Sequence, residues 1–530
     1  MSWLLVPAFL LAVAANAQLS RTTESIDVNV IEVDAVVLNA QGKPVPGLTR
    51  NDFELRVGGR RRPISNFYEV NRAVRKPEET AVARRDYLVL FIDDLHLDQH
   101  EKKRALDALR KFVSQHVHAG TAAMLVASDG NVRILERFTE DASAIARVID
   151  AFERRPAHVS EYERERRDVL NYIDQVRREC QDPKHIDCNP ETIPQRIESL
   201  AQLEQGMVDR TINALDHVAA AVSGLDGRRV LVYVSDGLPM QPGAEIFQYF
   251  KPEEFMTPGN IVTMRILQQS QPLDAMKSNL SSRFQAFARQ TALAGVQFFA
   301  IDARGVRGFD EGIESSAASS RLDSSLIRSN LHAPIQLLAD ETGGQAIIDE
   351  NDMEIAFAKL DEHLSSYYSL GFRTDNSHRE EDITVNVKRR GLTVRAAKHV
   401  RQRSGREQMA DRVRAALYAR IEDNPLDARI ALLPSAGSLK VTIRVPIPKL
   451  SILPGESTSF AVFVMMMDEN MRETPIRMFV HRVTAAELED SVQSLKLDVH
   501  PGTYTVSFAI ADSYSSQTSY LQREVTVPAN

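Results

Sequence analysis

The chain has 530 residues, of which 43% are hydrophobic and 26% are charged, and its formal net charge is −8. A chain of this length is too long for one hydrophobic core and predicts roughly three or four domains, and its composition excludes global disorder. The acidic balance argues against nucleic acid as a main partner, because a phosphate-binding surface needs an excess of Lys and Arg.

The first 17 residues have the pattern of a secretory signal peptide. An apolar run over 3–13 is followed by a small-x-small ending at 15–17, although no Lys or Arg precedes the run. We expect cleavage before Gln18 and export, either to the periplasm or to the cell exterior. The run is too short for a permanent membrane helix, and we expect no transmembrane segment in the mature chain.

The segment after the signal predicts a small antiparallel β domain over about residues 20–75. Apolar and polar residues alternate along 26–38, and strand-like runs follow at 53–57 and 64–70 with turn residues between them. A charged linker at 71–85 leads out of this domain.

Strands and helices alternate between about residues 85 and 400. A strand at 88–92 precedes a helix at 100–117, in which apolar residues recur at helical spacing. Further strands are predicted at 122–127, 132–138, 230–234, 296–301 and 367–372, and further helices at 142–152, 281–294, 335–342 and 353–366. This alternation is typical of a mostly parallel, doubly wound α/β sheet.

A polar, charge-rich helical insertion at about 155–205 interrupts the central domain, and we interpret it as a solvated arm or lid. It contains Cys180 and Cys188, which predict a local disulfide in an oxidising compartment. A metal site that includes His185 is the alternative, but a fourth ligand is missing nearby. The stretch 238–279 is predicted to be an irregular surface region.

From about residue 411 the pattern returns to β structure, after a helix at 411–420 that tethers two domains. Six strand-like segments follow, at 439–446, 457–467, 476–481, 495–499, 502–511 and 519–527. The sequence PGTYTVSFAIAD is typical of a turn that leads into a strand of an immunoglobulin-like sandwich. We therefore predict such a β-sandwich over 425–530.

Two strand ends of the central domain carry acidic side chains. The buried run that begins at Tyr87 ends in Asp93 and Asp94, and the run at 230–234 ends in Ser235 and Asp236. Parallel strands bring their carboxyl ends to one edge of the sheet, which is where α/β proteins place ligand sites. Oxygen ligands from two loops suit a hard divalent cation, so these residues predict a site for Mg²⁺ or Mn²⁺.

Six segments of the chain occur in the order and spacing of a known family. They are NVIEVDAVVLNAQGKPVPGLTRNDFEL, FIDDLHLD, VLVYVSDG, GVQFFAIDARG, LLADETGGQAI and SSYYSLGFRTD. Together they span 26 to about 400, and the ordered set is more specific than any one segment. On these segments the central region resembles a von Willebrand factor type A domain, and more narrowly the VWFA-related proteins of acidobacteria. The resemblance implies a Rossmann-like central domain between β domains.

The resemblance also implies a metal-ion-dependent adhesion site. In the family pattern, an Asp-x-Ser-x-Ser strand end, a Thr from a later loop and an Asp before Gly supply the ligands. Asp93 matches the first Asp, Asp236 the last, and Thr211 is the weak counterpart of the Thr. The two hydroxyl positions are Leu95 and Leu97 here, and Leu cannot coordinate a cation. The site is therefore predicted to be degenerate.

A second set of ligands is displaced by one residue along the same loop. Asp94, His96 and Asp98 offer oxygen and nitrogen atoms, and His96, Asp98 and Ser235 are also candidates for direct contact with a partner. Alternatively, Asp93 and Asp236 bind no metal and only accept hydrogen bonds from backbone amides.

The favoured hypothesis is an exported, non-enzymatic interaction or adhesion module that binds a protein or a cell-surface polymer. One alternative is a metal-dependent hydrolase that uses Asp93, Asp94 and His96, but no His-Glu-x-x-His motif accompanies them, and Ser235 lacks a Gly-x-Ser-x-Gly context. The other alternative is a structural envelope component, in which Asp93 and Asp236 contribute to stability only.

Overall fold

The computed structural model describes most of the chain. The described residues are 30–71, 85–155, 161–182, 188–306, 324–374, 379–452, 458–483, 489–515 and 517–529. The predicted signal peptide, most of the predicted linker and His185 lie outside them. Within the described residues, no helix is both long and apolar enough to span a membrane.

A β module holds two four-stranded sheets, with orders β13-β1-β11-β4 and β14-β12-β2-β3. The strands are β1 (Val30–Leu38), β2 (Phe53–Val57), β3 (Arg60–Arg62), β4 (Asn66–Asn71), β11 (Ser366–Arg373), β12 (Glu380–Val387), β13 (Thr393–Ala396) and β14 (His399–Arg401). Half of these strands precede the central domain in sequence and half follow it. The central domain is therefore an insertion in the β module.

The strand β11 differs from its sequence-based assignment to the central domain. It pairs antiparallel with β1 on one side and β4 on the other. Six of its eight residues are buried, because neighbours flank both edges and the core covers it. Because of this burial, β11 has the same run of apolar residues as a central parallel strand. The sequence pattern alone therefore does not show to which of the two sheets the strand belongs.

The central sheet has six strands in the order β10-β9-β8-β5-β6-β7, and only β7 runs antiparallel to its neighbour. The strands are β5 (Asp86–Asp93), β6 (Thr121–Ser128), β7 (Val132–Thr139), β8 (Arg228–Ser235), β9 (Val296–Asp302) and β10 (Ala346–Ile347). Antiparallel sheets lie on either side of this unit in the chain. The predicted fold class is confirmed.

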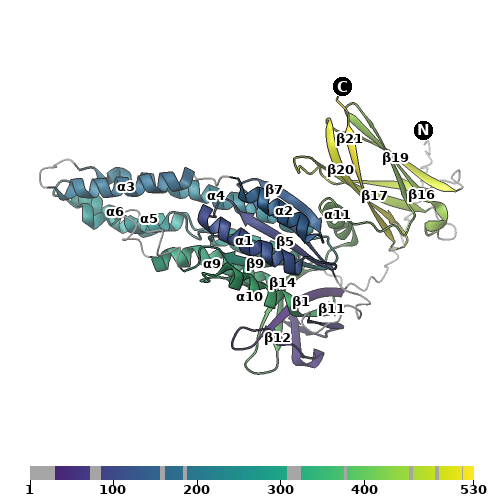
Figure 1. Cartoon of the computed structure of the whole chain (residues 1–530), viewed down its shortest axis with the longest axis horizontal. Helices are drawn as coiled ribbons and strands as arrows, with labels where there is room; N and C mark the ends of the chain where they lie inside the picture. Colours follow the sequence, from purple (N-terminus) through teal and green to yellow (C-terminus); the bar gives the residue numbers. More distant parts are fainter. Residues whose placement is uncertain are drawn as a thin grey trace, which may run out of the picture.

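Helices cover both faces of the central sheet (Figure 1). One apolar core contains residues of α1 (Gln99–His116), α2 (Ala142–Glu153) and α10 (Met353–Ser365). The core on the other face contains residues of α4 (Ile193–Val222), α7 (Ser281–Leu293), α9 (Ser324–Thr342) and α11 (Gly405–Ala415). Strands β5 and β6 are buried along their whole length as a result.

An elongated helical arm projects from the central domain at the end opposite to the C-terminal β strands (Figure 1). The arm contains α3 (Glu161–Gln181), the first half of α4, α5 (Ala244–Tyr249), the 3-10 helix Pro252–Phe255 and α6 (Ile261–Lys277), and these elements share one apolar core. The second half of α4 lies in the core of the central domain. The helix α4 thus runs without a break from the arm into the central domain.

The stretch 238–279 was predicted to be irregular, and that prediction is wrong, because α5 and α6 form there. Apolar residues occur all around α6 and not along one face. Met264 is buried, whereas Val262 and Ile266 are 68% and 59% exposed. A helix without a one-sided apolar stripe lacks the 3.6-residue period that sequence reasoning depends on.

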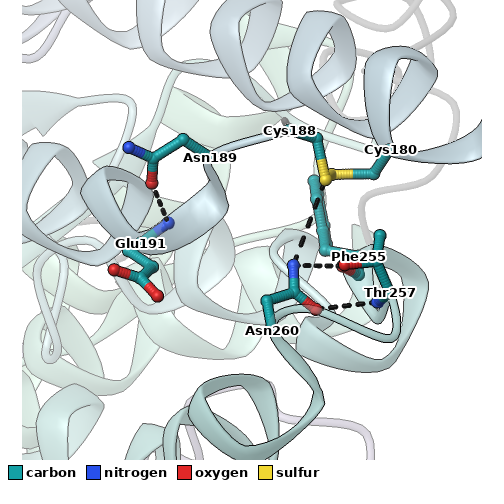
Figure 2. Close-up of a disulfide and its surroundings, with 7 residues drawn as sticks. All are labelled: Cys180, Cys188, Asn189, Glu191, Phe255, Thr257 and Asn260. Atoms are coloured by element: carbon teal, nitrogen blue, oxygen red, sulfur yellow. Dashed lines mark hydrogen bonds between the residues drawn. A yellow bond between two sulfur atoms is a disulfide. The ribbon is translucent and has the colours of Figure 1, made fainter. Parts of the chain in front are cut away.

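A disulfide between Cys180 and Cys188 joins the end of α3 to the segment before α4, with 5.0 Å between the two Cα atoms. Figure 2 shows Asn260, which precedes α6, beside this disulfide. The Asn260 side chain donates to the carbonyl oxygen of Phe255 (3.0 Å) and accepts from the amide of Thr257 (2.7 Å). The disulfide and this turn together fix the ends of three arm segments to one another.

The C-terminal strands form a sandwich of a three-stranded sheet, β15-β16-β19, and a four-stranded sheet, β18-β17-β20-β21. The strands are β15 (Arg429–Ser435), β16 (Ser438–Pro446), β17 (Ser459–Asp468), β18 (Arg477–Arg482), β19 (Asp490–Asp498), β20 (Gly502–Asp512) and β21 (Thr518–Val527). The sequence analysis missed β15, in which buried residues are absent and only alternate residues are partly covered.

The sandwich docks on the central domain through α11 and the residues that follow it. Phe463 on β17 and Val413 on α11 belong to the same apolar core as α4. A polar contact crosses the same interface: Tyr418 donates to Glu473 (2.6 Å), whose other oxygen pairs with Arg414 (2.7 Å). The central domain and the sandwich therefore share one core.

Candidate functional site at the carboxyl edge of the central sheet

The candidate site lies where β5, β8 and β9 end side by side, at the base of the arm. The loop after β5 leads to α1, and its His96 carbonyl oxygen accepts from the amide of Asp236 at the end of β8 (2.8 Å). Ser235 donates to the same carbonyl oxygen (3.3 Å). The backbone of one strand end thus holds the other in place.

Asp93 is completely buried and accepts hydrogen bonds from several protein groups. Its Oδ2 lies 2.5 Å from the Tyr233 hydroxyl, 2.8 Å from Nδ1 of His96 and 3.2 Å from the Thr211 hydroxyl. Its Oδ1 accepts from the amide of Leu95 (3.1 Å). These contacts come from β8, α4 and the loop after β5, so one carboxylate links three elements.

Burial and hydrogen bonding act in opposite directions on Asp93. Burial raises the pKa of this carboxyl group, but the charge interaction with His96 and the hydrogen bonds from His96 and Tyr233 outweigh it, and the net pKa lies below its ordinary value. Burial and the neighbouring Asp93 raise the pKa of Tyr233. Asp93 is therefore ionised and Tyr233 remains a hydrogen-bond donor.

Asp94 turns away from Asp93 towards α1 and β7. Its Oδ1 lies 2.6 Å from Nζ of Lys102, and its Oδ2 lies 3.7 Å from Arg133. Lys102 is 1% exposed and its ammonium group stands over the ring of Phe152. Asp94 is thus part of a buried ion pair that packs α1 against the sheet edge.

Asp236 is 4% exposed, and its two carboxylate oxygens have different surroundings. Oδ2 accepts from the amide of Asp98 (3.0 Å) and lies 3.8 Å from Arg304. Oδ1 is buried and has no hydrogen-bond partner among the described residues. Burial raises the pKa of Asp236 to about 7, against the opposing effect of Arg304, and the neighbouring carboxylates of Asp302 and Glu101 add to the rise.

The remaining predicted contact residues help to form the loops. Asp98 is the N-cap of α1 and accepts from the amide of His100 (2.9 Å). The Ser235 hydroxyl also accepts from the amide of Gly237 (3.1 Å). The Nδ1 of His96 is engaged by Asp93, and its Nε2 is buried without a hydrogen-bond partner in the described part of the chain.

Sequence reasoning missed four residues at this edge. Tyr233 lies within the strand segment VLVYVSDG and Arg304 within GVQFFAIDARG. Both segments contributed to the family resemblance, but neither residue was given a role. A second buried Asp and His pair, Asp302 on β9 and His332 on α9, are 3.0 Å apart. No sequence signal marks His332, because its partner is brought to it only by the packing of α9 on β9.

The side chains present do not fit a divalent cation at Asp93. Protein groups already occupy both carboxylate oxygens of Asp93, and Asp94 is engaged by Lys102. Leu95 packs against the arm core and Leu97 against the core under β5, so neither position offers an oxygen. In the described residues, no group of three or more His, Cys, Asp or Glu side chains is arranged to hold a metal ion. Binding of Mg²⁺ or Mn²⁺ stays a prediction of the sequence.

No family model and no curated protein matches this chain in sequence. Among solved structures, the three N-terminal domains of the type V pili tip protein Mfa5 from Porphyromonas gingivalis share 9% identity over 95% of this chain and 78% of that chain, with a TM-score of 0.25. A point mutant of the PilB minor pilin from Streptococcus sanguinis shares 10% identity over 63% of this chain and 87% of that chain, with a TM-score of 0.26. BatB from Bacteroides thetaiotaomicron shares 8% identity over 53% of this chain and 100% of that chain, with a TM-score of 0.22. These distant likenesses are too weak to support an argument about function.

Proposed function

We propose that this protein is an exported, non-enzymatic module that binds another protein or a cell-surface polymer through the helical arm. The observation that carries the proposal is the exposed apolar surface of α6. Ile261, Val262 and Ile266 are 39%, 68% and 59% exposed, on a helix that is fixed to a disulfide-closed hairpin. Adjacent exposed apolar side chains on a rigid support are typical of a surface that a partner covers.

The arm is built to keep its shape when it is exposed to the exterior. Its own core contains fully buried side chains from α3, α4 and the 3-10 helix, including Ile173, Ile197 and Phe255. The disulfide supports a location in an oxidising compartment, in agreement with the predicted export. A pre-ordered surface loses less conformational entropy on binding than a flexible one, which favours recognition by this arm.

The hydrolase alternative requires Asp93, Asp94 and His96 to act on one bound water. Asp94 forms an ion pair with the buried Lys102. Asp93 and His96 are hydrogen-bonded to each other, and their side chains are 0% and 10% exposed. A general base must reach a substrate proton, and these groups are directed at protein partners instead. The geometry therefore favours the binding module.

The test compares binding of labelled mature protein to intact cells of the producing organism. The variant Val262→Ser/Ile266→Ser removes the two most exposed apolar side chains of α6. The control is Ile355→Ser/Leu433→Ser, which removes two exposed apolar side chains (47% and 59%) on α10 and β15. We expect the arm variant to lose about tenfold or more in affinity and the control to bind like the parent protein. Equal binding by both variants, or no saturable binding by the parent protein, contradicts the proposal, and the second result favours a structural envelope component.

A further inference from the structure

We propose that the edge of strand β18 accepts an extended acidic segment of a partner protein as an added β strand. This surface belongs to the C-terminal sandwich and is separate from the arm, so the inference holds whether or not the arm binds a partner. Among the described residues, β18 is the last strand of its sheet and pairs only with β17. The outer edge of such a strand presents backbone N–H and C=O groups that another strand can bind.

The edge carries a row of exposed apolar side chains. Met478 and Val480 are 40% and 58% exposed, and Ile476, just before the strand, is 38% exposed. Their neighbours on β17, Phe463 and Ala461, lie opposite Met478 and Val480 in the register. Phe463 is buried in the core shared with the central domain, so the same face of the sheet continues from a covered region to an uncovered edge.

A hollow between the two sheets lies at the start of β18. It has a volume of about 90 Å³. Its lining includes the buried core residues Met466 of β17 and Leu497 of β19, Asp498 at the end of β19, Pro475, and Arg477, the first residue of β18. This volume is far below the roughly 300 Å³ at which small-molecule sites begin, and it suits a single side chain. Because side chains of a strand alternate between its two faces, one set from an added strand reaches this hollow and the other covers Met478 and Val480.

The positive charges of the β18 edge favour an acidic partner. Residues 474–483 contain two arginines and one histidine and no acidic residue, in a chain whose net charge is −8. Arg477 and Arg482 are both exposed. Antiparallel pairing of β18 with β18 of a second copy joins two edges that both carry Arg477 and Arg482, and like charges on adjoining strands are destabilising. The edge thus disfavours self-association and favours an acidic segment.

The experiment uses the mature protein and fluorescent peptides of about nine residues, a usual strand length, in which Val alternates with Glu and Thr. A second peptide has Lys in place of Glu, and a third carries N-methyl groups on alternate amides of the acidic peptide. Fluorescence anisotropy reports the affinity of each. We expect the acidic peptide to bind at least about tenfold more tightly than the other two, because it alone has both complementary charge and a complete backbone edge.

Matched protein variants locate the binding. Arg477→Glu/Arg482→Glu reverses both charges of the edge, and Lys440→Glu/Arg444→Glu makes the same change in net charge on the exposed face of β16, a central strand. We expect a loss of about tenfold in the first and less than about twofold in the second, with unchanged circular dichroism in both. Equal binding of the N-methylated peptide, an equal loss in the β16 variant, or a dimer that the edge variant dissociates in sedimentation overturns the proposal. The arm variant Val262→Ser/Ile266→Ser binds the peptide like the parent protein, which keeps the two proposals separable.

Discussion

Asp93 and Asp236 lie at the ends of neighbouring strands and are both buried, yet their pKa values move in opposite directions. The pKa of Asp93 lies below its ordinary value, whereas that of Asp236 is raised to about 7. Asp93 accepts from Leu95, His96, Thr211 and Tyr233, while Asp236 has one backbone donor, a longer contact with Arg304 and an oxygen without a partner in the described part of the chain. The pKa values of two buried carboxylates therefore shift in opposite directions, because the number of hydrogen-bond donors to a carboxylate decides whether its charged form is stabilised.

The comparison separates two roles at one sheet edge. Asp93 joins β5, β8 and α4 through its hydrogen bonds, so we assign it to stability. Asp236 changes its charge near neutral pH, since its pKa is about 7. Asp93, which matches the first Asp of the family pattern, thus has both carboxylate oxygens engaged by protein groups.

Removal of the Asp93 carboxylate is expected to have the largest effect. The substitution Asp93→Ala leaves the Tyr233 hydroxyl, the Thr211 hydroxyl and His96 without their acceptor in a buried site, and we expect the free energy of unfolding to fall by about 4 kcal/mol. Urea denaturation followed by circular dichroism measures the change. The variant Asp93→Asn retains one acceptor oxygen and should lose less. A loss below about 1 kcal/mol in Asp93→Ala refutes the stabilising role.

The substitution Asp236→Asn sharpens the contrast through its pH dependence. The folded pKa of Asp236 is raised from 3.8 to about 7, so its contribution to stability is complete below pH 3.8 and is lost as pH rises towards 7. The amide has no such titration. We therefore expect the stability of Asp236→Asn relative to the parent protein to increase with rising pH, by on the order of 4 kcal/mol between pH 4 and pH 8. Denaturation curves at both pH values test this, and a difference that is constant with pH contradicts it.

A smaller effect is expected from Tyr233→Phe, which removes one of the donors to Asp93 and keeps the ring in place. The other donors, including His96 and Thr211, remain. A hydrogen bond to a charged group contributes about 1.5–3 kcal/mol, and we expect a loss at the lower end because Asp93 stays partly satisfied. Thermal unfolding measures the stability of Tyr233→Phe, and Tyr249→Phe is the comparison, because the Tyr249 hydroxyl in the arm donates a hydrogen bond to Asp174. A variant as stable as the parent protein excludes a major role for this hydroxyl.

Sequence reasoning predicted the features that single segments encode. The strand ends at Asp93 and Asp236 were found because runs of buried residues stop abruptly at acidic ones. The contacts that define their chemistry were not found, because the Tyr233 hydroxyl reaches Asp93 only through the pairing of β8 with β5, and pairing is a property of two segments. The helix α6 was not predicted because its apolar residues lack a helical period. The strand β11 was assigned to the central sheet because a strand that is buried on both faces has the same run of apolar residues in an antiparallel sheet as in a parallel one.

The smallest effect is expected from divalent cations, and it tests the comparison most directly. A cation at Asp93 has to displace the Tyr233 and His96 contacts and then lacks oxygen ligands at Leu95 and Leu97. We therefore expect titration of Mg²⁺ or Mn²⁺ into the chelator-treated mature protein to give no saturable heat and a shift in melting temperature below about 1 °C. The controls are Asp93→Asn and Asp236→Asn. Saturable heat that Asp93→Asn abolishes contradicts the assignment of Asp93 to stability alone, whereas heat that only Asp236→Asn abolishes places the ion at the carboxylate whose second oxygen has no partner among the described residues.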